Sequence, residues 1–195
     1  MGGLMRRLGI RTGIIGGLAM LLIALFASVA LAVTPGVYSA TFDYTQAPGG
    51  THLVTPTTEG DVTCTVDANL NVTCPTTNFD IAGVGHTNAT ELLSTRYDAT
   101  IDCRNHGGQV VESHTQSAFV TAGPTTLRAK NGRLTTQTQT ATAPTDQQLQ
   151  SQATCPNPNW TAEVRPGTKV LSSLTWTVKF DGFTGAFITI SATDP

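Results

Sequence analysis

The stretch 102–114, "DCRNHGGQVVESH", gathers residue types that bind metals or transfer protons. Cys103, His106 and His114, with Cys155 from a later segment, could supply a zinc site, whose ligand atoms must converge within about 2.3 Å of one ion. If the Gly-Gly pair lies in a hairpin turn, His114 follows at least six residues along the return strand. At about 3.3 Å per residue, that places it roughly 20 Å from His106. We therefore expect no metal site, an exposed His106 in the turn and His114 on a strand.

Catalytic motifs are missing from the rest of the sequence as well. It has no Gly-x-Ser-x-Gly elbow, no His-Glu-x-x-His helix and no glycine-rich phosphate loop. The four histidines and thirteen acidic residues show no spacing that selects a catalytic pair. We therefore expect a protein that is not an enzyme, with no catalytic residues and no cofactor. A small secreted hydrolase with paired carboxylates is an alternative that the sequence leaves open.

The four cysteines are an even set, which indicates disulfides in an exported protein. Three pairings are possible. Cys64 and Cys74 lie equally far from Asn69, so a hairpin that turns there would place them opposite each other. That leaves Cys103 to pair with Cys155, and an oxidised sulfur is no thiolate ligand for a metal.

Most of the chain shows the alternation of half-buried strands, with threonine and other polar residues between apolar ones. The residues expected to face inward are Tyr38, Ala40, Phe42 and Tyr44 in "GVYSATFDY", Tyr97, Ala99, Ile101 and Cys103 in "RYDATIDC", and Val170, Leu174, Trp176, Val178 and Phe180 in "KVLSSLTWTVKF". Turns are indicated at 67–69 and at Asn131-Gly132. Only "TDQQLQSQA" could form a turn or two of helix. Eight to ten strands packed as two antiparallel sheets predict an all-β sandwich, immunoglobulin-like or similar.

The first 32 residues have the features of a secretory signal peptide: three arginines, an apolar run and the ending Ala30-Leu31-Ala32. The alternative is an uncleaved membrane anchor, since the apolar run is long enough to span a bilayer. Cleavage would remove three of eleven basic residues and none of thirteen acids, so the net charge would change from −2 to −5. A chain of this charge is not expected to bind nucleic acid. Residues 33–195 suit a single domain.

Two residues are candidates for ligand contact. Trp160 follows the proline-rich loop "CPNPN", residues 155–159, and its ring could stack on a sugar or pack inward with Ala162 and Val164. His106 would be exposed in the turn of the 102–114 hairpin. The loop from Cys155 to Asn159, held by a disulfide, could also be presented to a protease cleft.

Three segments carry a resemblance to a known group of proteins: "YDATIDCRNHGGQ", "CPNPNWTAEV" and "LTWTVKFDGFTGAFITI". They resemble small secreted proteins of actinobacteria that pair a Cys-x-Asn-x-Gly-Gly turn with a later Cys-Pro and an Asn-Trp-Thr strand. The resemblance covers roughly residues 60 to 190 and implies an exported all-β, immunoglobulin-like domain without implying an activity. The Cys…Trp…Cys order of true immunoglobulin domains is absent, because Trp160 follows Cys155.

These features predict a secreted, non-enzymatic β-sandwich that binds or builds structure outside the cell or at the cell envelope. The expected partner is an extracellular protein or polysaccharide, with a membrane involved only if the N-terminal segment is retained. The alternatives are a protease inhibitor that presents residues 155–159 and a small secreted hydrolase.

Overall fold

The computed structural model describes residues 32–193. The signal peptide or anchor expected at residues 1–32 lies outside this range except for its last residue, Ala32. The strands are β1 (Gly36–Ser39), β2 (Thr41–Phe42), β3 (His52–Leu53), β4 (Thr63–Val66), β5 (Val72–Cys74), β6 (Asp80–Ala82), β7 (Ala89–Arg104), β8 (Val110–Leu127), β9 (Arg133–Thr135), β10 (Gln139–Ala141), β11 (Thr161–Val164), β12 (Val170–Phe180) and β13 (Ile188–Thr193). The helical elements are the 3-10 turns η1 (Tyr44–Gln46) and η2 (Glu59–Asp61) and the α-helix α1 (Asp146–Gln152).

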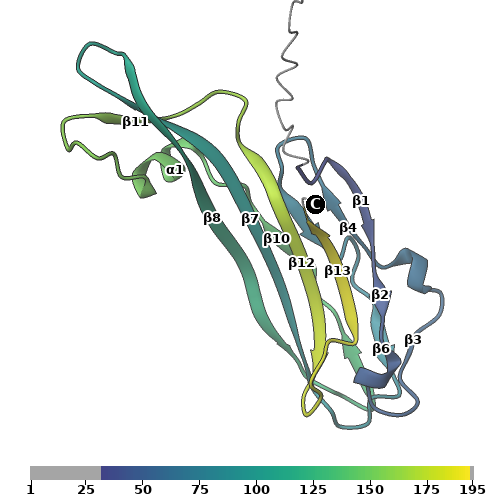
Figure 1. The fold of residues 1–195 in the computed structure, drawn as a ribbon. Coiled ribbons are helices and arrows are strands. Elements are labelled where there is room, and N and C mark those ends of the chain that lie inside the picture. Colours follow the sequence, from purple (N-terminus) through teal and green to yellow (C-terminus); the bar gives the residue numbers. More distant parts are fainter. Residues whose placement is uncertain (1–31, 194–195) are drawn as a thin grey trace, which may run out of the picture.

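The strands form antiparallel sheets packed on one core (Figure 1). One layer is a six-stranded sheet in which β7 pairs with β8 along one edge and with β11 and β12 along the other, followed by β13 and β2. Opposite it lie a four-stranded sheet, ordered β1-β4-β5-β10, and a three-stranded sheet, ordered β3-β6-β9. Buried residues of all three sheets belong to one hydrophobic cluster. The predicted all-β antiparallel sandwich is confirmed.

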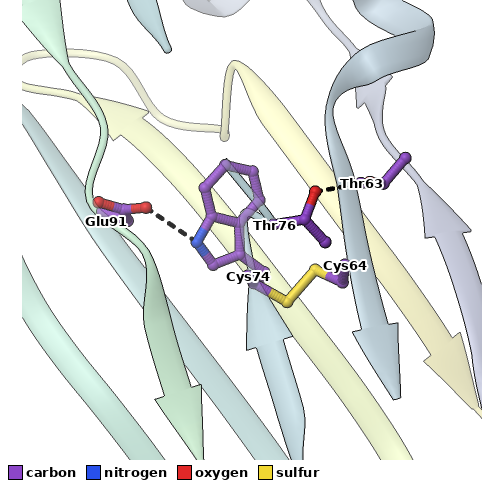
Figure 2. The surroundings of a disulfide bond; sticks show 6 residues. Thr63, Cys64, Cys74, Thr76 and Glu91 are labelled. Carbon is purple, nitrogen blue, oxygen red and sulfur yellow. Dashed lines mark hydrogen bonds between the residues drawn. A yellow bond between two sulfur atoms is a disulfide. The ribbon is translucent and has the colours of Figure 1, made fainter. Parts of the chain in front are cut away.

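The core is built from the inward side of each strand. Its largest fully buried side chains are Trp176, Tyr97, Phe180, Phe187, Ile81, Leu93, Leu134, Leu171, Leu174 and Ile188. The Cys64–Cys74 disulfide lies inside this core. It joins β4 to β5 across the hairpin that turns at residues 67–71, as the equal spacing of the two cysteines about Asn69 predicted. Figure 2 shows this disulfide and the buried carboxylate of Glu91 on the facing sheet.

A long β-hairpin extends beyond the sandwich (Figure 1). It is formed by β7, with 16 residues, and β8, with 18. The lower part of β7 pairs with β12, and its last four residues pair with β11. Near the tip, Leu149 of α1 packs with Ala99 and Ala118 in a second small core, and the Cys103–Cys155 disulfide fastens the segment between α1 and β11 to β7. This pairing of the cysteines is the one favoured by the sequence.

Two strand patterns differ from the prediction, each for a local reason. In β12 the register shifts between Leu171 and Ser173, so Leu171 is fully buried and Val170 is only half-buried. The bulge turns the intervening Ser172 outward, where its hydroxyl donates a hydrogen bond to Asp98. The stretch "GVYSATFDY" is not one strand: at Ala40 it passes from the four-stranded sheet, as β1, to the six-stranded sheet, as β2.

Candidate functional site

The segment of residues 126–137, "TLRAKNGRLTTQ", leaves β8 of the six-stranded sheet, turns at Asn131-Gly132 and enters β9 of the three-stranded sheet. Its two arms are joined by one β-bridge, Lys130 to Arg133, and we call the segment the groove hairpin. Its exposed polar side chains border one groove. Leu127, Leu134 and Thr136 are buried, and the residues that alternate with them are exposed. This is the period of two that a half-buried strand imposes. The exposed face carries Thr126, Arg128 and Lys130 on one arm and Arg133, Thr135 and Gln137 on the other.

The turn of this hairpin brings two cations together. Asn131 and Gly132 adopt φ of 52° and 74°, the left-handed region that an Asn-Gly turn favours. Lys130 and Arg133 exchange backbone hydrogen bonds of 2.8 and 3.1 Å across the turn. Because opposed residues of an antiparallel pair point to the same face, the side chains of Lys130 and Arg133 extend on the same side. The Asn-Gly turn itself was predicted from the sequence.

Hydrogen bonds fasten the hairpin to the sandwich. The N–H of Ala129 donates to Asn88 Oδ1 at 2.9 Å, and the N–H of Val84 donates to the carbonyl of Gly132 at 3.2 Å. The backbone that presents the cations is therefore held at both the first arm and the turn.

The exposed face of the hairpin borders a groove of about 740 Å³. This volume falls within the range of about 300–1,000 Å³ that is usual for ligand sites. The groove is lined by Asp80, Thr126, Leu127, Arg128, Lys130, Asn131, Arg133, Thr135 and Gln137. Asp80 comes from β6, where it is opposite Thr135 of β9, and its carboxylate accepts a 2.6 Å hydrogen bond from the Thr135 hydroxyl.

The three cations of the groove, Arg128, Lys130 and Arg133, form no ion pair within residues 32–193. The ion pairs of this part of the chain use other cations, namely Arg96, Arg104, Arg165 and Lys169. The groove thus holds three unpaired positive charges and one carboxylate, on a chain whose net charge is −2.

A fourth unpaired cation continues this positive surface. Lys179 of β12 is opposite Thr90 of β7, and Thr90 is opposite the groove residue Thr126 of β8. Opposed residues share a face, so all three side chains lie on the outer face of the six-stranded sheet. Two strand spacings separate Lys179 from Thr126, roughly 10 Å. The exposed carboxylate of Asp181 lies two residues beyond Lys179 in the following turn.

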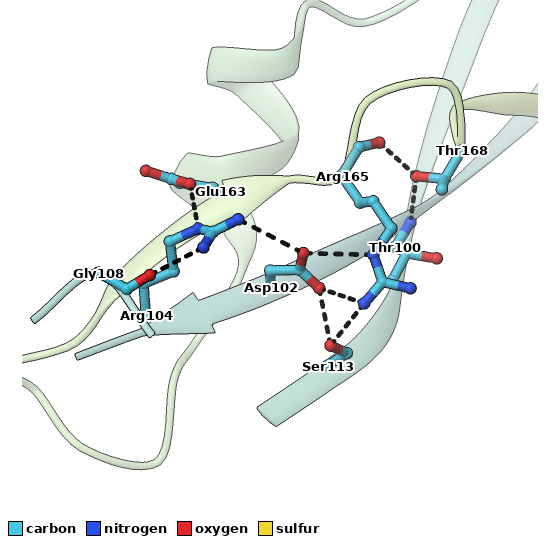
Figure 3. Close-up of polar contacts among 8 residues, drawn as sticks. All are labelled: Thr100, Asp102, Arg104, Gly108, Ser113, Glu163, Arg165 and Thr168. Atoms are coloured by element: carbon cyan, nitrogen blue, oxygen red, sulfur yellow. Dashed lines mark hydrogen bonds and ion pairs between the residues drawn. The ribbon is translucent and has the colours of Figure 1, made fainter. Parts of the chain in front are cut away.

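The cations near the tip end of β7 differ from those of the groove, because they form ion pairs with carboxylates of the chain (Figure 3). The guanidinium of Arg165 donates to both carboxylate oxygens of Asp102, at 2.6 and 3.2 Å, and also to the Ser113 hydroxyl, which itself donates to Asp102. Arg104 donates to Glu163 and to a backbone carbonyl. The hydrogen bonds from Arg165 and then from Ser113 hold the pKa of Asp102 below its usual range. These cations line a smaller hollow of about 420 Å³, but carboxylates of the chain already neutralise them.

One carboxyl group lies in the core behind the groove. Glu91 is fully buried. Its two oxygens accept hydrogen bonds of 3.1 Å from Trp176 Nε1 and 3.0 Å from the backbone N–H of Gln137. Figure 2 shows the first of these bonds as the dashed line from Glu91 to an indole nitrogen. Burial raises the pKa of Glu91 to about 7, although these two hydrogen bonds act in the opposite direction. Nearby, Gln139 Nε2 donates to the carbonyl of Glu91. This group couples the groove hairpin to the core and is not open to a ligand.

The residues predicted as ligand contacts lie far from the groove. His106 is exposed in the hairpin turn, which is closed by a 3.0 Å hydrogen bond from the Asn105 N–H to the carbonyl of Gln109. Trp160 is half-buried at the end of a turn, and its backbone N–H donates a hydrogen bond to the Asn157 carbonyl. Because β11 begins opposite the last residue of β7, both residues lie at the tip end of the long hairpin. The groove begins at the other end of β8, about 60 Å away for 18 residues.

The sequence does contain a signal for the groove, which the strand analysis missed. Three cations fall within six residues around Asn131-Gly132, on a chain with only eleven basic residues. Arg128 and Lys130 occupy alternate positions of one arm and therefore share a face, and the tight turn brings Arg133 beside Lys130. The contribution of Asp80 has no such signal, because Asp80 precedes Thr126, the first residue of the segment, by 46 residues.

Between residues 32 and 193, no helix has both the length and the apolar character needed to cross a membrane. In the same range, no three His, Cys, Asp or Glu side chains come together as a metal site would require. Comparison with known proteins also gives no match, whether to family models, to curated proteins or to solved structures.

Proposed function

We propose that this protein is exported and acts outside the cell, without catalysis, by holding a hydrophilic polymer in the groove of residues 126–137. The observation that carries the proposal is the groove itself: a ligand-sized hollow lined by charged, hydroxyl and amide groups on a hairpin fastened to the sandwich. An envelope or matrix polysaccharide has the polar groups that such a lining can bind.

Two disulfides support the export of the chain. Cys64–Cys74 and Cys103–Cys155 involve all four cysteines, which suits an oxidising compartment outside the cytosol. Cleavage of the N-terminal segment would release the sandwich; retention would keep the same groove at the membrane surface.

A polysaccharide suits the groove better than a protein partner. Protein interfaces take most of their affinity from buried aromatic and apolar anchors. No aromatic side chain lines the groove within the described residues, and the side chain of Leu127, its only large apolar residue, is buried. The residues that line the groove can form hydrogen bonds and charge pairs with a ligand that is itself rich in polar groups.

Binding also suits the groove better than hydrolysis. Glycoside hydrolysis generally uses two carboxyl groups on either side of the scissile bond. Among the residues described, the groove contains one, Asp80, and that carboxylate accepts a hydrogen bond from Thr135.

The inhibitor hypothesis receives no comparable support. In the segment 155–159, Asn157 Oδ1 accepts a hydrogen bond from the Asn159 N–H, and the Asn157 carbonyl accepts one from the N–H of Trp160. This is a closed turn, whereas recognition by strand addition needs an extended segment.

Capture of envelope polysaccharide tests the proposal. The exported protein, expressed with its own N-terminal segment, is immobilised and offered polysaccharide fractions from the envelope of the producing cell. Thr126→Trp places an indole in the groove, and Thr121→Trp places one on an exposed position of the same strand outside the groove. We expect the wild type and Thr121→Trp to retain polysaccharide and Thr126→Trp to lose it. Retention by none of the proteins, or equal retention by Thr126→Trp, would contradict the proposal.

A further inference from the structure

We infer that the polymer held in the groove is a polyanion: a sugar polymer that carries carboxylate or phosphodiester groups along its length. The inference rests on the proposed function and adds the chemical class of the ligand.

The distribution of charge favours a polyanionic ligand. Eight basic residues fall within the described range, and the four that form no ion pair there are Arg128, Lys130, Arg133 and Lys179. All four lie at one end of the sandwich, on the hairpin and the adjoining outer face of the six-stranded sheet. The chain thus neutralises its other cations with its own carboxylates and leaves this group available. A local positive field on an acidic protein raises the concentration of anions at that place.

The spacing of the cations indicates a polymer. Lys130 and Arg133 extend side by side from the turn, and Arg128 lies two residues before Lys130, about 7 Å along an extended chain. Lys179 adds a charge roughly 10 Å from Thr126 on the neighbouring face. A single small anion would contact one or two of these groups. An extended chain with repeated anionic groups can contact the whole row.

The neutral groups of the groove fit the sugar part of such a polymer. The hydroxyls of Thr126 and Thr135 and the amide of Gln137 can donate to and accept from ring hydroxyls. Asp80 accepts from hydroxyls and repels anions, so it favours a ligand whose charges alternate with neutral hydroxyl-bearing units.

Single-stranded nucleic acid is a poorer match for the same charges. Its binding sites combine basic grooves with aromatic side chains on which bases stack. The residues that line this groove include no aromatic side chain within the described chain.

The test uses three defined polymers with the full exported protein: polygalacturonate as a polycarboxylate, poly(glycerol phosphate) as a phosphodiester polymer and dextran as a neutral control. Binding is measured by biolayer interferometry at about 50 and about 200 mM salt. We expect binding to at least one polyanion, weaker binding at the higher salt concentration because exposed charge pairs are screened, and no binding to dextran. A preference between the two polyanions identifies the anionic group.

Charge variants place the effect in the groove. Arg128→Gln, Lys130→Gln and Arg133→Gln should each weaken polyanion binding by about tenfold, as expected for the loss of one charge-assisted hydrogen bond. Lys130→Arg keeps the charge and should bind as the wild type does. Arg96→Gln is the matched control: it removes one charge about 20 Å up β7 from Thr90 and should leave binding unchanged. Circular dichroism and urea unfolding check that each variant folds.

The outcomes separate this inference from the proposed function. Three results would overturn the polyanion inference: binding of dextran as strong as that of the polyanions, binding that does not change with salt concentration, or charge variants that bind the polyanions as the wild type does. If Thr126→Trp still abolished capture of envelope polysaccharide in that case, the groove would remain a binding site for a neutral ligand. Absence of binding to all three polymers would also overturn the inference, while the envelope capture decides the proposed function independently.

Discussion

Replacement of Glu91 by glutamine should change how the stability of the protein depends on pH. The carboxyl group is fully buried, and its pKa is raised from an ordinary value of 4.5 to about 7 by burial. At about 1.4 kcal/mol per pKa unit, the penalty for ionising Glu91 in the folded protein amounts to about 3–4 kcal/mol.

The sign of the effect follows from the direction of the shift. Below pH 4.5 the carboxyl is protonated in both the folded and the unfolded chain, so no penalty applies. As pH rises from about 4.5, the unfolded chain loses this proton first, and the free energy of unfolding falls by up to about 3–4 kcal/mol before it levels off above pH 7. Asp98 and Asp102 have lowered pKa values, so they change protonation state only below about pH 4 and do not affect the pH dependence of stability between pH 4.5 and 7.

Urea unfolding at a series of pH values from about 4.5 to 8.5 measures this dependence, with fluorescence of the buried Trp176 as a probe. We expect the wild type to lose stability across this range and Glu91→Gln to remain nearly flat. Glu112→Gln, which removes an exposed carboxylate from β8, is the control and should follow the wild type. The same slope in the wild type and Glu91→Gln, or a wild type that gains stability as pH rises, would refute the reasoning.

Three further substitutions test the structure at other points. Replacing Cys103 and Cys155 together by alanine should lower the free energy of unfolding by about 4 kcal/mol in urea unfolding, because the unfolded chain regains the conformational entropy of the loop that the disulfide closes. Arg165→Gln removes the main hydrogen-bond donor to Asp102 and should raise the pKa of that carboxyl toward its usual range, as measured by carbon-13 NMR titration. Gly83→Ala should destabilise the fold by roughly 2 kcal/mol or more in thermal unfolding, because its Cβ would lie 2.0 Å from a backbone oxygen at φ +77°.

Each of these substitutions has a result that would count against the structure. The disulfide variant would do so if its stability matched the wild type, and Arg165→Gln if the pKa of Asp102 did not move. For the glycine, Gly85→Ala is a matched control, since it also has positive φ but has open space around its Cβ. Equal losses at Gly83 and Gly85 would show that the close contact is absent.

Local patterns in the sequence were sufficient for the strands and turns. The alternation in "RYDATIDC" predicted which side chains of β7 face inward, and Tyr97, Ala99, Ile101 and Cys103 are all buried. The Asn-Gly turn and the spacing of cysteines about Asn69 predicted two hairpins because these signals act over a few residues.

Features that depend on distant contacts were not predictable in this way. The bulge in β12 shifts the inward face from Val170 to Leu171 and depends on pairing with β7. Asp102 alternates with the inward-facing residues of β7 and lies on the outer face, yet it is nearly buried because Arg165, 63 residues later, folds over it.

The groove depends both on a local sequence pattern and on contacts between distant residues. Its three cations follow one another in "RAKNGR", but their lack of ion pairs emerges only after the other cations of the described chain have found partners. The sequence pointed instead to Trp160 and His106, because an aromatic residue after a proline-rich loop and a histidine in a turn are conspicuous locally.

The groove of residues 126–137 carries both the proposed function and the polyanion inference, and NMR chemical-shift mapping tests that groove directly. Nitrogen-15-labelled protein is titrated with a short oligomer of galacturonate, and amide shifts are mapped onto the structure. We expect the largest shifts at residues 126–137 and at Asp80, with little change near Trp160 and His106. Shifts centred on the hairpin tip around Trp160 and His106, or no shifts with either galacturonate or glycerol-phosphate oligomers, would contradict the account.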